Sequence, residues 1–67
     1  MADKKRNFVV LGLGTFGRTI ATELASFGNH VLGIDSNEDH VNDVVDELSE
    51  AIIADTRDEE ALREAGV

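Results

Sequence analysis

The sequence predicts an α/β protein with one half of a Rossmann-type parallel sheet, in the order βαβαβα and with the strand order 3-2-1. Three observations predict it. Strand-like apolar runs alternate with amphipathic helical segments, a glycine-rich turn joins the first run to the first helix, and an acidic residue ends the second run. A chain of 67 residues is too short for a doubly wound sheet of about six strands. We therefore interpret residues 1–67 as the amino-terminal half of one nucleotide-binding domain, incomplete without a second half or a partner chain.

The first expected strand spans residues 7–12, an apolar run rich in β-branched residues that is typical of a parallel strand buried on both faces. A helix follows, because apolar residues then recur every three or four positions. These residues are Phe16, Ile20, Leu24 and Phe27. Gly28 is expected to end this helix in a left-handed conformation.

The second expected strand covers residues 30–35, and Ser36 with Asp39 resembles a capping box. The helix that follows carries an apolar face made of Val41, Val44, Val45 and Leu48. Residues 51–54 form a third strand, and Thr56 with Glu59 is a second capping pattern. The last helix turns Ala61, Leu62 and Ala65 inward and ends at Gly66.

In this strand order the first strand keeps an open apolar edge, so we expect it to be completed by further chain or to pair with another chain. Right-handed crossovers between parallel strands are assumed throughout.

Composition excludes several classes of partner. Six Lys and Arg against fourteen Asp and Glu give a net charge of −8, which repels nucleic acid and anionic membrane surfaces. The absence of Cys excludes disulfides and thiolate metal sites and is compatible with an intracellular origin. The apolar run before Gly12 is too short for a signal peptide or a membrane span. His30 and His40 share no ligand spacing, so we predict no metal site and interpret both as surface or strand-edge residues.

The glycine-rich turn predicts a phosphate site. Gly12 makes the tight turn, Gly14 lets a pyrophosphate approach the backbone, and Gly17 lets the helix pack close to the strand. The free N–H groups and the positive end of the helix then attract the phosphates. The alternative is a glycine turn kept for packing alone.

Acidic and basic residues follow the strands at the edge where ligands of such folds bind. Asp35 is placed to accept hydrogen bonds from ribose hydroxyls and to repel a 2′-phosphate, which disfavours NADP; alternatively it only helps to open the next helix. Asp55 could flank the adenine. Thr56 could instead cap the last helix, Arg57 could be a solvated loop charge, and Arg18 could either bind phosphate or be exposed.

Three segments, residues 8–24, 33–35 and 51–66, resemble the amino-terminal half of the Ktr/Trk potassium-uptake regulatory subunits, the RCK (KTN, or TrkA-N) domain. The third segment, an Asp-led turn into an acidic helix that ends in Ala-Gly, is more specific than the glycine loop. The resemblance implies a cytoplasmic, ring-forming homo-oligomer that binds adenine nucleotides (ATP or ADP) or NAD(H). It also implies that this regulator gates a membrane-embedded potassium-translocating subunit and is held at the inner face of the membrane by that partner.

By resemblance, the cofactor-binding residues are Gly12, Gly14, Thr15, Phe16 and Gly17 in the phosphate loop, Asp35 at the ribose, and Asp55, Thr56 and Arg57 at the adenine-side turn. Two residues depart from the family pattern. Thr15 stands where members of the ATP-responsive type often have an Arg that reaches a terminal phosphate. Arg57 stands where many members have Thr.

Three functions remain open at this point. The first is a ligand-gated regulatory domain, the second an NAD-dependent oxidoreductase whose catalytic residues lie beyond residue 67, and the third an assembly module that binds no nucleotide. No acid and base pair and no activated nucleophile is recognisable in the sequence, so no catalytic residue is assigned and the protein is not expected to be an enzyme.

Overall fold

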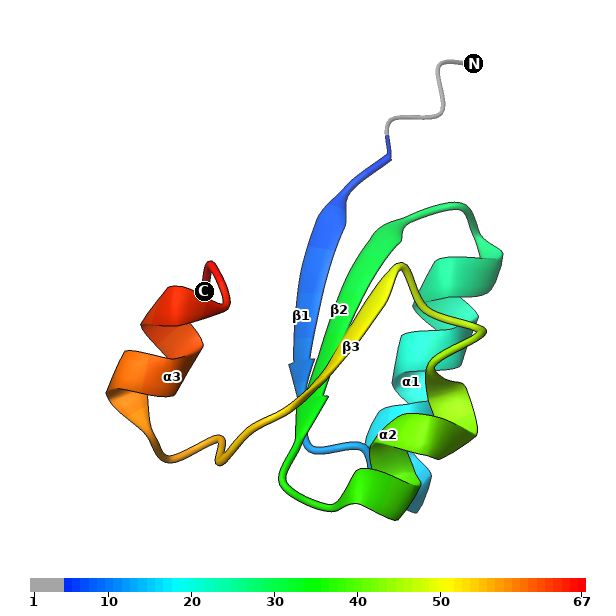
Figure 1. Cartoon of the computed structure of the whole chain (residues 1–67). Helices are drawn as coiled ribbons and strands as arrows, with labels where there is room; N and C mark the ends of the chain where they lie inside the picture. Colours follow the sequence, from blue (N-terminus) through cyan, green and yellow to red (C-terminus); the bar gives the residue numbers. More distant parts are fainter. Residues whose placement is uncertain (1–4) are drawn as a thin grey trace.

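A computed structural model, which describes residues 5–67, confirms the predicted alternation of three strands and three helices (Figure 1). The elements are β1 (Asn7–Leu11), α1 (Thr15–Ser26), β2 (His30–Asp35), α2 (Glu38–Val44), β3 (Glu50–Ile53) and α3 (Glu59–Glu64). All pairings are parallel, and β2 lies between β1 and β3, which is the predicted 3-2-1 order.

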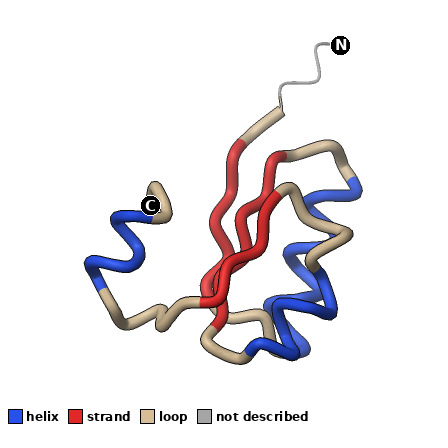
Figure 2. The backbone as a smooth tube through the Cα atoms, viewed as in Figure 1, coloured by secondary structure: helices blue, strands red, loops and turns tan. Residues whose placement is uncertain are grey.

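The sheet separates two groups of helices. Figure 2 shows α1 and α2 together on one side of the three strands and α3 on the other. Strands β1 and β2 pair from Asn7 opposite His30 to Leu11 opposite Ile34. Since side chains alternate along a strand, Phe8 and Val31 share the face covered by α1 and α2, and Ile34 points to the opposite face.

The main core lies between the sheet and the helices α1 and α2. Its buried residues are Leu13, Ala21, Val31, Val41, Val44 and Leu48. Around them pack the partly buried side chains of Phe8, Val10, Leu24, Ala25 and Ala51. Burial of each large aliphatic side chain contributes roughly 1.5–3 kcal/mol, so aliphatic packing on this face stabilises the fold. Leu32 and Ile34 add buried side chains on the opposite face.

Strand β1 is not buried on both faces as its apolar run predicts. Phe8 and Val10 are half-buried under α1, whereas Val9 and Leu11 are 43% and 49% exposed. The reason is that helix α1 covers one face of β1, while no strand among residues 5–67 pairs with its outer edge. The predicted open edge of β1 is therefore present.

Of the apolar residues of α1 predicted to face the sheet, Leu24 packs against the core, but the other three do not. Phe16 and Phe27 are each 79% exposed and Ile20 is 40% exposed, whereas Ala21 is fully buried. Gly17 explains this orientation, because a Cβ atom at this position would collide with the carbonyl oxygen of Gly12. Only the side of α1 with small residues can come so close to the strand. We call the outward set of Phe16, Ile20 and Phe27 the α1 apolar stripe.

The predicted glycine cap of α1 is confirmed. Gly28 has a φ of +87°, and its N–H donates to the carbonyl of Ala25 at 2.9 Å while the N–H of Asn29 donates to Leu24 at 3.3 Å. These two bonds form the Schellman motif. Helix α3 ends in the same way at Gly66, where φ is +93°.

The predicted amino-terminal caps are wrong. Asn37, not Ser36, caps α2 and accepts from the N–H groups of Asp39 and His40. Asp58, not Thr56, caps α3. In both places an Asp at the end of the preceding strand binds the N–H two residues on, which forms a local turn and moves the start of the helix along the chain. Helix α2 is also shorter than predicted, and Val45 is 44% exposed just after its end.

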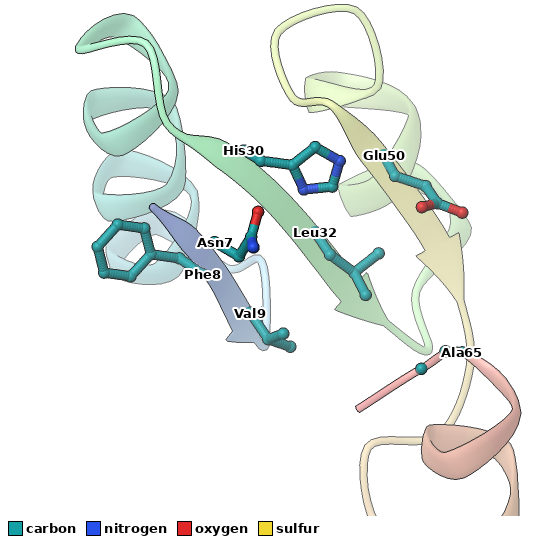
Figure 3. Close-up of a pocket in the computed structure, with 8 residues that line it drawn as sticks. Asn7, Phe8, Val9, His30, Leu32, Glu50 and Ala65 are labelled. Carbon is teal, nitrogen blue, oxygen red and sulfur yellow. The ribbon is translucent and has the colours of Figure 1, made fainter. Parts of the chain in front are cut away.

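Helix α3 packs less tightly than α1 and α2. Its predicted inward residues Ala61, Leu62 and Ala65 are half-buried, but none is fully buried. A hollow of about 330 Å³ lies between the end of α3 and the first residues of the three strands (Figure 3). It is lined by Asn7, Phe8, Val9, His30, Leu32, Glu50, Ala65 and Gly66. This hollow lies at the amino ends of the strands, away from the glycine-rich turn.

The close approach at Gly17 gives a first prediction. We expect Gly17→Ala to destabilise the fold by about 1–3 kcal/mol, because the added methyl group must push α1 away from Gly12. Urea unfolding would measure the loss. Gly14→Ala is the matched control: its Cβ would meet no atom within 4 Å and its φ of −66° suits alanine, so a smaller loss is expected. Equal losses in the two variants would contradict the packing role of Gly17.

Candidate functional site

The candidate site lies at the carboxyl ends of the strands, where the glycine-rich turn leaves β1. Gly12 has a φ of +98°, in the left-handed region that favours glycine. Its N–H donates to the carbonyl of Ile34 at 2.8 Å, so the turn begins as a continuation of the pairing between β1 and β2. Leu13 follows, and its fully buried side chain anchors the turn to the core.

The start of α1 faces open space. Gly14 is its N-cap and supplies no side-chain cap, and no acidic residue lies in the first turn. Among residues 5–67 the N–H groups of Thr15, Phe16 and Gly17 donate to no protein acceptor. A Cβ atom at Gly14 would also meet nothing within 4 Å. The arrangement therefore offers free donors and the positive end of a helix to an anion that approaches the backbone.

Asp35 holds the turn, β2 and α2 together. Its Oδ2 accepts from the N–H of Leu13 at 2.6 Å and lies 3.1 Å from Nδ1 of His40, and its Oδ1 accepts from the N–H of Asn37 at 2.8 Å. The Asp35 side chain is only 12% exposed. The N–H of Asn37, followed by that of Leu13 and by His40, lowers the pKa of Asp35 below its ordinary value of 3.8, although burial opposes this shift. The carboxylate is ionised at neutral pH.

Asp35 does help to start α2, as the alternative interpretation from the sequence proposed, because its carboxylate accepts from the N–H of the capping residue Asn37. Its binding to ribose remains a prediction.

Asp55 lies at the same edge of the sheet as Asp35. The N–H of Ala54 donates to the carbonyl of Asp35 at 3.0 Å, so Asp55 follows directly after the last contact between the two strands. Its carboxylate accepts from the backbone N–H of Arg57 at 2.8 Å and from the guanidinium at 3.2 and 3.3 Å. These bonds lower the pKa of Asp55 and raise that of Arg57.

Arg57 is 88% exposed and paired with Asp55, so it is a surface residue with a partner in its own loop. Such exposed pairs contribute little to stability, and its side chain is free to change partner. Among the described residues the side chain of Thr56 makes no hydrogen bond, which fits its failure to cap α3. Arg18 points toward α2, where Nη1 lies 3.0 Å from Oδ2 of Asp43, and it is not directed at the turn.

The structure thus brings the predicted phosphate loop and Asp35 into direct contact, and it places Asp55, Thr56 and Arg57 at the next strand end. Phe16 belongs to the exposed α1 apolar stripe. Sequence reasoning missed Leu13, whose N–H binds Asp35, and the partner of His40. The interpretation of His40 as a surface residue is incomplete, because its side chain is 39% exposed yet contacts Asp35. Recognition of Asn37 as the cap would have placed His40 in the first turn of α2, beside Asp35.

Comparisons with known proteins agree with this architecture. Residues 8–67 match the TrkA-N domain. The chain is 40% identical to the Ktr system potassium uptake protein C of Bacillus subtilis (strain 168) over 63 residues, which are 94% of this chain and 28% of that protein. It is 39% identical to the Ktr system potassium uptake protein A of the same organism over 64 residues, 96% of this chain and 29% of that protein. It is 41% identical to the Ktr system potassium uptake protein A of Vibrio alginolyticus over 59 residues, 88% of this chain and 27% of that protein.

The chain therefore spans less than a third of the length of these relatives. Within residues 5–67, no helix has the length and apolar character needed to cross a membrane.

The contacts of Asp35 predict a pH dependence of stability. Its pKa is lower in the folded than in the unfolded chain, so its contribution is complete above about pH 3.8 and is lost as the pH falls through the folded value. We expect Asp35→Asn to be less stable than the wild type at pH 7 and this difference to shrink below pH 3.8. Urea unfolding at several pH values measures this difference in the free energy of unfolding. Asp46→Asn, which removes the same charge from an exposed position, should show no such convergence.

Proposed function

This chain belongs to the TrkA-N domain family, and we propose that it binds an adenine nucleotide, ATP or ADP, or NAD(H), and thereby regulates potassium uptake through a membrane-embedded partner. The observation that carries the proposal is the contact between the N–H of Leu13 and the carboxylate of Asp35. It joins a phosphate-binding turn to a ribose-binding acid in one rigid unit. A nucleoside diphosphate carries a pyrophosphate for the turn and a ribose for the acid at matching positions.

The phosphate end of the proposed site rests on the start of α1. The free N–H groups of Thr15, Phe16 and Gly17 and the open space at Gly14 suit a pyrophosphate. Arg18 pairs with Asp43 and is not directed at the turn, and Thr15 carries no charge. These facts favour ADP or NAD(H) over a response confined to ATP.

The ribose and adenine ends rest on the two acids at the sheet edge. Asp35 is ionised and mostly buried, so a second negative charge beside it is unfavourable, and NADP is disfavoured. Asp55 with its turn through Thr56 and Arg57 lies one strand further, where the adenine of a bound nucleotide would lie. An exposed Arg57 could stack on the base after it leaves Asp55.

Regulation requires no chemistry on the nucleotide. A ligand shifts a conformational equilibrium when its affinity for the two states differs, and this is sufficient to gate a partner. Three relatives are named as potassium uptake proteins, which supports this role over that of an NAD-dependent oxidoreductase. We further propose a cytoplasmic protein that is held at the inner face of the membrane by its potassium-translocating partner.

The exposed apolar surface supports assembly into a homo-oligomer. The α1 apolar stripe presents two phenylalanines that are 79% exposed, and the open edge of β1 exposes Val9 and Leu11. Val9 and Leu11 point to the face of the sheet opposite α1, whereas the stripe gathers its large apolar groups along one helix. Such a group of exposed apolar side chains is typical of protein interfaces. We propose that a second copy of the chain covers the stripe.

A thermal-shift panel on the whole protein tests the nucleotide site. ADP, ATP, NAD and NADH at about 100 times Kd would stabilise a binding protein by about 2.7 kcal/mol, a rise in Tm of several degrees. NADP is expected to give the smallest shift. If none of these nucleotides raises the Tm, the proposal is contradicted and a module for assembly alone is favoured.

We expect Gly14→Asp to weaken ADP and NAD binding at least a hundredfold, because it puts a side chain and a negative charge where the pyrophosphate meets the backbone. Isothermal titration calorimetry measures the affinity. Asn42→Asp adds the same charge at an exposed position of α2 and should bind normally. Normal binding by a folded Gly14→Asp protein would refute the site.

Assembly has a separate test. Phe27→Ser removes an exposed ring from the end of the stripe that is far from the glycine-rich turn, and we expect it to weaken self-association roughly ten- to a hundredfold, the effect of about 1.5–3 kcal/mol of lost burial. Analytical ultracentrifugation measures this change. Val45→Ser, at the 44% exposed residue that follows α2, is the matched control and should assemble normally. Equal assembly of both variants would show that the stripe is no interface.

A further inference from the structure

The carboxylate of Asp35 has few acceptor positions left. Two oxygens offer about four lone-pair sites. Oδ2 already faces the N–H of Leu13 and Nδ1 of His40, and Oδ1 faces the N–H of Asn37. One position therefore remains, on Oδ1. A ribose with free 2′- and 3′-hydroxyls needs two positions to donate from both.

His40 is the partner that can leave. The two backbone N–H groups belong to the glycine-rich turn and to the cap of α2, and they fix both oxygens of Asp35 without help from His40. The His40 side chain is 39% exposed and can rotate toward solvent. Because an ionised carboxylate only accepts hydrogen bonds, the Nδ1 of His40 carries the proton in this contact.

We propose that His40 is a specificity-determining residue at the ribose end of the site: it occupies the Asp35 position that a second ribose hydroxyl requires and so relaxes the selection for a free 2′,3′-diol. The inference rests on the proposed nucleotide binding and specifies what its ribose subsite accepts.

The contact between His40 and Asp35 weakens two ligand preferences. A diol that bonds to both oxygens must displace His40, so one hydrogen bond replaces another and the gain over a 2′-deoxyribose is small. A 2′-phosphate near Asp35 meets the N–H of His40 as well as the carboxylate, so it is repelled less than the acid alone would repel it. Removal of His40 therefore increases both the preference for ADP over 2′-deoxy-ADP and the preference for NAD over NADP.

The test compares Kd values for these two ligand pairs by calorimetry in the whole protein. The variants are wild type, His40→Ala and His40→Asn, each checked for an intact fold by its urea midpoint. We expect His40→Ala to raise both preference ratios about five- to tenfold. His40→Asn places an amide N–H near the position of Nδ1 and is expected to keep the wild-type ratios.

The outcomes separate this inference from the proposed function. If wild type binds ADP and NAD and His40→Ala leaves both ratios unchanged, His40 selects nothing and only this inference fails. If His40→Asn changes the ratios as much as His40→Ala, the Nδ1 contact is not the cause and the inference also fails. If wild type binds none of the nucleotides, the proposed function fails and the inference fails with it.

Discussion

The hydrogen bonds of the Asp35 carboxylate connect the parts of this protein that matter for its site. One oxygen takes the N–H of Leu13 from the glycine-rich turn, and the other takes the N–H of Asn37 at the start of α2. A single ionised side chain thus fixes the turn, the end of β2 and the capped helix relative to one another. Charge-assisted bonds in a site that is 12% exposed are stronger than neutral ones, which makes this a rigid frame.

The close approach of α1 to Gly12 at Gly17 determines which side of the helix faces the sheet. Since the helix lies against the carbonyl oxygen of Gly12, only small side chains fit underneath, and Ala21 fills the contact. Phe16, Ile20 and Phe27 then face away from the sheet, while Leu24, further along the helix, packs against the core. The close approach of α1 to the glycine-rich turn therefore also leaves the apolar stripe exposed, and the proposed ligand binding and the proposed assembly use the same helix.

Two regions of the structure are candidates for a ligand site, and their chemistry differs. The hollow under α3 lies at the amino ends of the strands and is lined mostly by apolar and uncharged residues (Figure 3). Glu50 is the acid among its lining residues and disfavours an anion there. The carboxyl edge has the free N–H groups of α1 and the two acids. Family membership agrees with the carboxyl edge, where Rossmann-type domains bind their ligands.

The sequence by itself determined the order of elements, the glycine-rich turn, the acid at the end of β2 and the glycine cap of α1, because each depends on periodicity or on the local conformational freedom of glycine. Only the tertiary structure decided which side of α1 is buried, where α2 and α3 begin, and that His40 contacts Asp35. These features depend on distances between elements, and a local pattern with two plausible apolar faces or two plausible caps carries no information on such distances.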